Sequence, residues 1–373
     1  MDPPAPAALA RRLGVALALA GCADAPPPEA TLVAARDLGP LRQSSVVRGR
    51  DGGPSLRVHG RSVWLFGDTT QQRANADGQT WLNDSWSFTE QTRAAEGITL
   101  TDRLDAAGGL TEFFPLTPEE RAFNVAHRGD PCAEPPCGAR WAFWPGAGVV
   151  DPATGRALIF YGKIRAAPGD FNFRAVGYSL ATWDAFDRPP VRPIVAPGRP
   201  EPTLLFGEND PAFGAAAVLV DGALYAWGCN QQGLGKPCRL ARVPVAQALD
   251  RGAWRFWSGT GWSAAVTDAA TLFDGNDILS VSWAPALGRF LAVYSEPLGR
   301  TVVLRTAPRP EGPWSATLRL FEARAPSEGN GWVYDAQAHA EFAEDGGRVQ
   351  YVTYSRTTGF FEGEFRLVQV TLR

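Results

Sequence analysis

Residues 50–69 contain the clearest hydrophobic pattern of the chain, which is typical of two strands joined by a tight turn. Apolar and polar side chains alternate over residues 56–59, and an apolar run over residues 62–66 follows the turn at Gly60. Each end carries an aspartate beside glycine: Asp51 precedes two glycines, and Asp68 follows one. Glycine lets the backbone bend sharply or approach a ligand closely. The two aspartates are therefore either turn residues that cap a hairpin or members of a site.

This strand pair recurs in altered form, which indicates a repeat fold. Further pairs occupy residues 144–162, 213–228, 278–294 and 336–354. In most pairs the first strand is small or polar and the second is bulky and apolar. A β-propeller explains the asymmetry, because innermost strands crowd around an axis and second strands fill the core between blades. We predict an all-β, five-bladed β-propeller; a pair of β-sandwiches is the alternative.

Helix-forming patterns are scarce. Thr117 is a good helix cap, Pro118 suits the first helical position, and Glu120 stands three residues after the cap, so a short helix is predicted there. A second short helix is predicted over residues 245–250. Residues 70–140 form the longest segment between two recognised units. We expect this segment to be a loop insertion that lies over one face of the propeller and walls the site.

Composition narrows the classes of partner. The chain has 373 residues, of which 45% are hydrophobic, and a net charge of −3. This balance argues against nucleic acid as the main partner, because phosphate binding needs clustered basic charge. The 40 Gly and 31 Pro indicate many turns, and the 13 Trp suit either an aromatic core or a sugar-stacking cleft.

The amino terminus has the pattern of a bacterial lipoprotein signal. Two arginines precede an apolar run over residues 13–20 that is too short to span a bilayer, and residues 19–22 resemble a lipobox ending in Cys22. We predict a signal peptide over residues 1–21, lipidation of Cys22, a Pro-rich tether over residues 22–35 and the propeller over residues 36–373. The alternative is an ordinary secretory signal with a chance cysteine. The protein is accordingly expected in the bacterial cell envelope, attached to the membrane through lipid and monomeric.

The other cysteines fall into two close pairs, Cys132 with Cys137 and Cys229 with Cys238. After export, two local disulfides are the simplest arrangement. A four-cysteine zinc site is the alternative, although neither spacing matches a zinc knuckle.

Candidate chemistry gathers where innermost strands begin, because these positions converge on the axis. Several carboxylates aimed at one cavity shift one another's pKa, and a glycosidase needs one carboxyl protonated and another ionised. Asp and Asn also favour turns, so any single one can be structural. The residues at these starts are Asp51, Glu208, Asp210, Asp277, Tyr334 and Asp335.

Other side chains could complete such a site. His339 lies within a predicted innermost strand, where it could reach the axis and hold a metal or water, or be a hydrogen-bonded core histidine. Tryptophans that flank the proposed face could stack on sugar rings, although Trp is more often found in the core. The further candidates for substrate binding are Trp81, Asn83, Asp84, Trp144 and Trp262.

Several motifs together resemble the DUF4185 family. They are DGGPS at residues 51–55, VWLFGDT at 63–69, WLNDSW at 81–86, LGRFLAVYS at 287–295, APRPEGPWS at 307–315 and YDAQAH at 334–339. The resemblance covers about residues 36–373. It implies a five-bladed propeller like that of arabinanase-type glycosidases, and some members are endo-D-arabinanases. It places the catalytic pair at Asp51 and Asp68, and a blade-five histidine near an axial ion, which favours His339.

The combined hypothesis is a lipid-anchored glycoside hydrolase that acts on a furanose-containing, arabinan-like polysaccharide. Asp51 and Asp68 would share the nucleophile and acid/base roles, with Glu208 or Asp210 as a third carboxylate. No cofactor is required, and an axial ion such as calcium is the candidate metal. The alternative is a non-catalytic propeller that binds glycan or protein at the cell surface.

Overall fold

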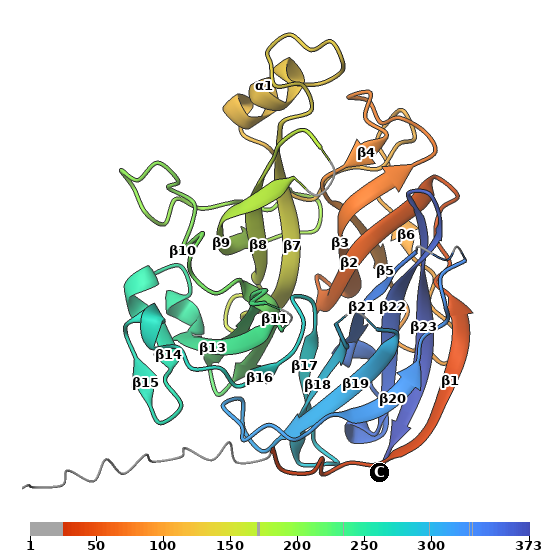
Figure 1. Cartoon of the computed structure of the whole chain (residues 1–373), viewed down its shortest axis with the longest axis vertical. Coiled ribbons are helices and arrows are strands. Elements are labelled where there is room, and N and C mark those ends of the chain that lie inside the picture. Colours follow the sequence, from red (N-terminus) through yellow and green to blue (C-terminus); the bar gives the residue numbers. More distant parts are fainter. Residues whose placement is uncertain (1–24, 170–171, 234, 298, 328, 330) are drawn as a thin grey trace, which may run out of the picture.

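The computed structural model describes residues 25–169, 172–233, 235–297, 299–327, 329 and 331–373. Five β-sheets surround a central axis, and their innermost strands face that axis (Figure 1). The predicted five-bladed propeller is therefore confirmed. Within the described residues, no helix combines the length and the apolar character needed to cross a membrane. The predicted lipidation residue, Cys22, lies outside the described residues.

Blade 1 is larger than the sequence pattern indicated. Its strand order is β2-β3-β5-β6, and β4 pairs separately with β3. Three of its strands fall inside the segment that was predicted to be a loop insertion over residues 70–140, so only its later part, with helix α1 (Pro118–Ala126), lies outside the sheet. The strands are β2 (Val47–Val58), β3 (Arg61–Gln71), β4 (Trp81–Leu82), β5 (Ser85–Thr89) and β6 (Thr101–Asp102).

Blades 2 to 4 follow in chain order, each beginning at the axis with its first strand. Blade 2 contains β7 (Arg140–Val150), β8 (Ala157–Ala166), β9 (Phe173–Trp183) and β10 (Phe206–Gly207). Blade 3 contains β11 (Phe213–Val220), β12 (Ala223–Cys229), β13 (Pro237–Pro244), β14 (Arg255–Trp257), β15 (Trp262–Ser263) and β16 (Phe273–Asp274). Blade 4 contains β17 (Ser280–Ala284), β18 (Arg289–Ser295), β19 (Thr301–Ala307) and β20 (Leu318–Glu322).

Blade 5 closes the ring with strands from both ends of the chain. Its order is β21 (Val333–Ala338), β22 (Val349–Gly359), β23 (Glu362–Leu372) and, outermost, β1 (Leu32–Pro40). Strand β1 pairs antiparallel with β23 along its length. The propeller therefore begins before residue 36, the predicted boundary, and strand β1 includes the last part of the predicted tether.

The core lies between neighbouring blades, as the bulky second strands predicted. Leu65 of β3 and Ile159 of β8 are fully buried in one cluster between blades 1 and 2. Trp227 of β12 and Val303 of β19 belong to a corresponding cluster between blades 3 and 4. Each blade is thus held mainly by apolar contacts with the next, which fixes the positions of the innermost strands around the axis.

Both predicted disulfides are present. Cys132 and Cys137 are bonded, with Cα atoms 5.4 Å apart, in the loop after α1. Cys229 and Cys238 are bonded between directly paired residues of β12 and β13, with Cα atoms 4.1 Å apart. Two disulfides agree with the predicted export of the protein.

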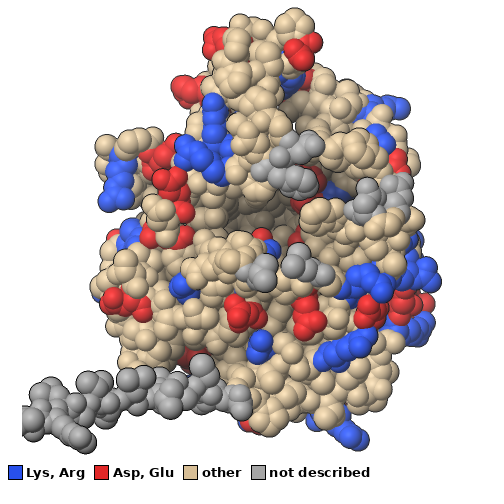
Figure 2. All heavy atoms as spheres, in the orientation of Figure 1, with Lys and Arg blue, Asp and Glu red and all other residues tan. Residues whose placement is uncertain are grey.

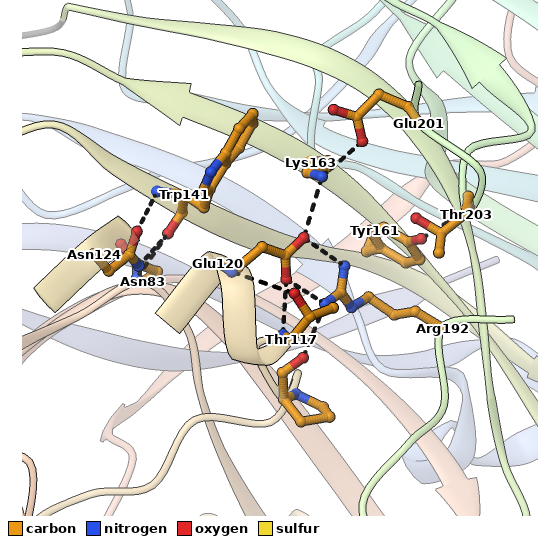
Figure 3. Close-up of polar contacts among 11 residues, drawn as sticks. Asn83, Thr117, Glu120, Asn124, Trp141, Tyr161, Lys163, Arg192, Glu201 and Thr203 are labelled. Atoms are coloured by element: carbon orange, nitrogen blue, oxygen red, sulfur yellow. Dashed lines mark hydrogen bonds and ion pairs between the residues drawn. The ribbon is translucent and has the colours of Figure 1, made fainter. Parts of the chain in front are cut away.

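Helix α1 begins as predicted, because Thr117 and Glu120 form a reciprocal capping box. The Glu120 carboxylate also makes ion pairs with Lys163 of β8, at 3.1 Å, and with Arg192, at 2.5 Å (Figure 3). Lys163 pairs in turn with Glu201 at 2.6 Å. This buried network fastens the helix to blade 2. The second helix, predicted over residues 245–250, is instead two short 3₁₀ segments, Val245–Gln247 and Arg251–Ala253.

Candidate active site

The β2–β3 hairpin brings Asp51 and Asp68 to the same end of blade 1. Arg50 pairs with Thr69 and Gly52 with Phe66, and the register shifts between these two pairs, where Asp51 lies. The Asp51 carboxylate packs against Gly67 so closely that a Cβ at Gly67 would collide with it. Glycine before Asp68 therefore makes room for the other aspartate of the pair.

The surroundings of Asp51 favour its acid form. Burial raises the pKa of Asp51 well above its ordinary value, and the neighbouring carboxyls of Asp335 and Asp68 raise it further, although backbone N–H groups of Asp51 and Asp68 oppose the shift. Carboxyl groups that cannot all ionise in one pocket have this behaviour. The Asp51 side chain is thus suited to donate a proton.

Asp68 has a different environment, although burial also raises its pKa. The Arg140 guanidinium lies 3.8 Å from Asp68 Oδ1, and the charge of Arg140 and the indole groups of Trp81 and Trp144 oppose that rise. Oδ1 is buried and accepts no hydrogen bond of good geometry from the described residues, yet the Asp68 side chain as a whole is 25% exposed. Burial thus raises the pKa of both carboxyls, but acidic neighbours add to the rise at Asp51, whereas a cation and two indole groups oppose it at Asp68.

Asn83, predicted to bind substrate, instead supports Arg140. Its Oδ1 accepts a hydrogen bond of 2.7 Å from Arg140 Nε. Asn83 is only 4% exposed, so its observed role is to orient the guanidinium that faces Asp68.

Blade 5 supplies the opposite side of the site. The Tyr334 phenol lies near the carboxyls of Asp51, Asp335 and Asp68. Burial raises the pKa of Tyr334 well above its ordinary value, and the charges of these carboxyls add to the rise. Asp335 Oδ2 accepts a hydrogen bond of 2.7 Å from the backbone N–H of Gly52. The predicted convergence of blades 1 and 5 is therefore present in the structure.

Asp277 lies at the edge of this group. Its carboxylate pairs with Lys236. Burial raises the pKa of Asp335, and the charge of Asp277 raises it further, although a hydrogen bond from the Gly52 backbone opposes the rise. Blade 4 thus contributes through the segment before β17, as the sequence predicted. Figure 2 shows that the molecule is hollowed near the centre of the ring, with acidic atoms at the margin of the hollow.

Two aromatic pairs flank Asp68. Trp81, 39% exposed, packs edge-on against Phe361 of the β22–β23 turn, which is 49% exposed, with ring centres 4.9 Å apart. Trp144 packs edge-on against Phe173, with ring centres 4.7 Å apart. Exposed aromatic rings beside carboxyl groups suit the apolar faces of sugar rings.

Other predicted residues lie elsewhere. Glu208 forms an exposed ion pair with Arg174 at 2.9 Å, and Asp210 accepts the Gly207 N–H at 2.9 Å. Both line a groove of about 500 Å³ beside Arg174. No contact or pKa effect among the described residues joins either one to Asp51 or Asp68. The structure therefore does not place Glu208 or Asp210, the predicted third carboxylate, beside Asp51 and Asp68.

Two substrate-binding predictions are replaced by structural roles. Asp84 is 1% exposed, and its carboxylate accepts the backbone N–H groups of Phe113 and Phe114, so it holds the segment that follows blade 1. Trp262 lies on β15, the outermost strand of blade 3, where it packs on Trp257. Among the described residues, no contact joins either side chain to Asp51 or Asp68.

His339 is fully enclosed. It follows β21 and precedes a 3₁₀ turn, Ala340–Phe342, rather than lying within the strand. Its Nδ1 contacts Ser55 Oγ at 2.6 Å and its Nε2 contacts Thr353 Oγ1 at 2.7 Å, and burial lowers its pKa to about 3. Both ring nitrogens are therefore engaged by hydroxyl groups. No group of three or more His, Cys, Asp or Glu suited to a metal ion occurs among the described residues.

Sequence reasoning missed Arg140, Gln337 and Phe361. Arg140 directly precedes Trp141 at the start of β7, so the convergence rule applied to the other blades could have found it. Gln337 donates to the backbone carbonyl of Gly52, a contact across blades that has no local signal. Phe361 lies in a strand turn at positive φ, where an exposed phenylalanine is itself unusual.

Solved structures share the fold at low sequence identity. A hydrolase candidate from Bacteroides ovatus is 14% identical, covers 87% of this chain and 87% of its own, and superposes with a TM-score of 0.57. Zg3597 from Zobellia galactanivorans, a family 117 glycoside hydrolase, is 11% identical, covers 92% of this chain and 91% of its own, with a TM-score of 0.53. No curated protein matches the sequence.

The family comparison agrees with the sequence motifs. The segment that matches a family, residues 180–353, contains the motifs of blades 4 and 5 but not those of blade 1. Over residues 180–353, the chain matches the family described as a domain of unknown function, DUF4185.

Proposed function

We propose that the protein is a glycoside hydrolase in which Asp51 is the general acid and Asp68 the nucleophile or general base. The observation that carries this proposal is the pair of carboxyls at one end of the β2–β3 hairpin, whose neighbours differ in charge. Burial raises the pKa of both carboxyls; acidic neighbours raise that of Asp51 further, whereas Arg140 and two indoles oppose the rise at Asp68. Environments that separate two carboxyls in this way identify the acid and the base.

The substrate class follows from the surroundings of the pair. The aromatic pairs Trp81–Phe361 and Trp144–Phe173 both flank Asp68, so sugar rings can stack beside the carboxyl from two blades. This arrangement favours a chain of several sugars. The preference for furanose-containing, arabinan-like polysaccharides comes from the motif resemblance, and the family 117 glycoside hydrolase with the same fold supports the reaction class.

A screen of released sugars tests the proposal. The wild-type protein is incubated with bacterial and plant polysaccharides, including arabinans built of each arabinofuranose enantiomer, and reducing ends are measured. An Asp51→Asn/Asp68→Asn double variant serves as the blank. We expect new reducing ends from a furanose-containing polymer with the wild type alone. Binding of a glycan without release by either protein would favour the alternative, a non-catalytic binding propeller.

The lipid anchor is a separate part of the proposal and rests on the sequence of residues 19–22. We expect Cys22→Ser to move the protein from the membrane fraction to the soluble fraction, or to leave it unprocessed. Metabolic labelling with a fatty acid supplies the direct measurement. A wild-type protein that carries no acyl group and stays soluble would contradict lipidation. Such a result would leave the proposed hydrolase activity untouched.

A further inference from the structure

The directions of the strands distinguish the two faces of the propeller. Arg140 is the first residue of β7, Asp277 precedes β17, and Tyr334 and Asp335 lie near the beginning of β21. The candidate active site therefore lies on the face where the innermost strands begin. Because neighbouring strands are antiparallel, β18 and β20 begin on the opposite face, and β19 and β23 end there.

The first described residues are attached to this opposite face at blade 4. The carbonyl of Pro26 accepts a hydrogen bond of 2.7 Å from the N–H of Ala316, which lies between β19 and β20. The N–H of Glu29 donates to Thr306 Oγ1, near the end of β19, at 3.1 Å. The Glu29 carboxylate pairs with Arg289, the first residue of β18. Three contacts thus fasten this segment where strands of blade 4 begin or end.

The attachment continues at blade 5. Thr31 and Arg373 exchange backbone hydrogen bonds of 2.8 and 2.9 Å beyond the end of β23, and Ala30 is buried in the core cluster between blades 4 and 5. Figure 1 shows the start of the described chain and the C-terminus at the end of the molecule away from α1 and β4. Residues 26–31, the docked segment, are therefore fixed to the face opposite the candidate site.

The predicted lipidation residue lies close to the docked segment in the sequence. Three residues separate Cys22 from Pro26. Even fully extended, this connection places the two Cα atoms at most about 14 Å apart. A folded domain of this length has a radius of gyration of roughly 20 Å. A lipid on Cys22 cannot reach around such a domain to the site face, so the bilayer must lie against the face that holds the docked segment.

The same face presents exposed apolar side chains. Trp283, 47% exposed, lies near the end of β17 and packs on Phe290 at the beginning of β18, with ring centres 4.9 Å apart. Indole groups are favoured at the boundary between membrane and water. Val33 is also exposed, near the beginning of β1, which pairs with the end of β23. These side chains suit the surface that a lipid on Cys22 would bring against the membrane.

We propose that the face opposite the candidate active site rests on the membrane surface, and that the docked segment holds it there. The inference rests on the proposed lipid at Cys22 and is independent of hydrolase activity. The candidate site then opens away from the bilayer. It meets a polymer in the aqueous phase instead of a glycan linked to a membrane lipid.

Energy transfer from single labels to the membrane tests the orientation. A dye is attached to Arg309→Cys, an exposed position between β19 and β20, or to Phe360→Cys, an exposed position in the β22–β23 turn on the site face. The acylated full-length protein is placed in phosphatidylethanolamine/phosphatidylglycerol vesicles that contain an acceptor lipid. We expect at least about twofold greater transfer from Arg309→Cys, because a domain of this size separates its faces by tens of ångströms. Equal or reversed transfer would overturn the proposal.

A spacer variant is the matched control. About 20 Gly and Ser residues inserted before Ala25 lengthen the connection by roughly 70 Å when extended and leave the docked segment unchanged. We expect the two labels to transfer about equally in this variant. A difference that persists would show that the short connection does not set the orientation, contrary to the proposal.

Two further measurements separate the ways in which the proposal can fail. Hydrogen exchange of the Glu29 and Thr31 amides reports docking without any membrane, and exchange as fast as in a free peptide would overturn the docked segment. Fatty-acid labelling of the same sample reports the anchor. A protein without an acyl group contradicts the anchor and the orientation together, whereas an acylated protein with equal transfer contradicts the orientation alone.

Discussion

Asp68→Asn is expected to abolish detectable release of sugars, with kcat lower by at least roughly 10²–10⁴-fold. The variant keeps the shape of the side chain but cannot act as a nucleophile or accept a proton. Asp51→Asn should cause a loss of similar size, because an amide cannot protonate the leaving group. Both rates are measured as reducing ends on the polymer found in the screen.

Stability and binding distinguish these losses from misfolding. Asp68 Oδ1 accepts no hydrogen bond of good geometry from the described residues, so replacement by Asn breaks no described internal hydrogen bond at this atom. We expect an unchanged or higher melting temperature and retained glycan binding through the aromatic pairs. Activity near the wild-type level in either variant would remove that residue from the proposed mechanism.

Glu208→Gln is the matched control for the pair. The Glu208 carboxylate was predicted as a third catalytic acid, but it forms an ion pair with Arg174 in which both side chains are more than half exposed. Surface pairs of this kind contribute about 0–1 kcal/mol. We expect kcat within about twofold of the wild type. A loss as large as that of Asp68→Asn would place the groove beside β10 in the active site.

Local patterns account for the parts of the structure that the sequence predicted well. The alternation in residues 56–59 and the apolar run that follows are properties of one hairpin, so they indicated both strands and the shared end of Asp51 and Asp68. The capping pattern of Thr117 and Glu120 likewise depends on residues three apart. The five strand pairs then specified the blades, because each pair is a local unit.

The missing parts depend on contacts between distant segments. Strand β1 joins β23 across the whole length of the chain, and no turn links the two. Trp262 was expected at the site because the sequence did not reveal that blade 3 extends outward through β14 and β15. Strand pairing of this kind is decided by packing in the folded state and leaves little trace in a single sequence.

His339 shows why convergence on the axis was too simple a rule. An innermost strand directs its edge toward the channel, and its side chains alternate between the two neighbouring blades. Asp335, Gln337 and His339 accordingly all contact β2 of blade 1, at Gly52 and Ser55. Asp335 reaches the site because it contacts Gly52, the residue after Asp51, whereas His339 lies two alternations further along and is buried against Ser55.

The buried ion network around Glu120 gives the largest expected effect on stability. Glu120 accepts from Arg192 and from the Thr117 N–H and pairs with Lys163, and all three ionic side chains are 9% exposed or less (Figure 3). Although burial opposes ionisation, the hydrogen bond and charge of Arg192 lower the pKa of Glu120. The carboxylate therefore stabilises the fold above its unfolded pKa of about 4.3, and that stabilisation is lost as the pH falls.

Glu120→Ala is expected to lower the free energy of unfolding by about 3–5 kcal/mol at pH 7, because it leaves Lys163 and Arg192 buried with only Glu201 to balance them. Urea denaturation measures the loss, and proteolysis near α1 tests whether the helix detaches from blade 2 first. Glu119→Ala is the matched control: the neighbouring side chain is exposed on the same helix, so its removal should change stability by about 0.5 kcal/mol or less. Equal stability of the two variants at pH 7 would show that the network contributes no net stabilisation, and that apolar packing of the insertion alone fixes it over the propeller.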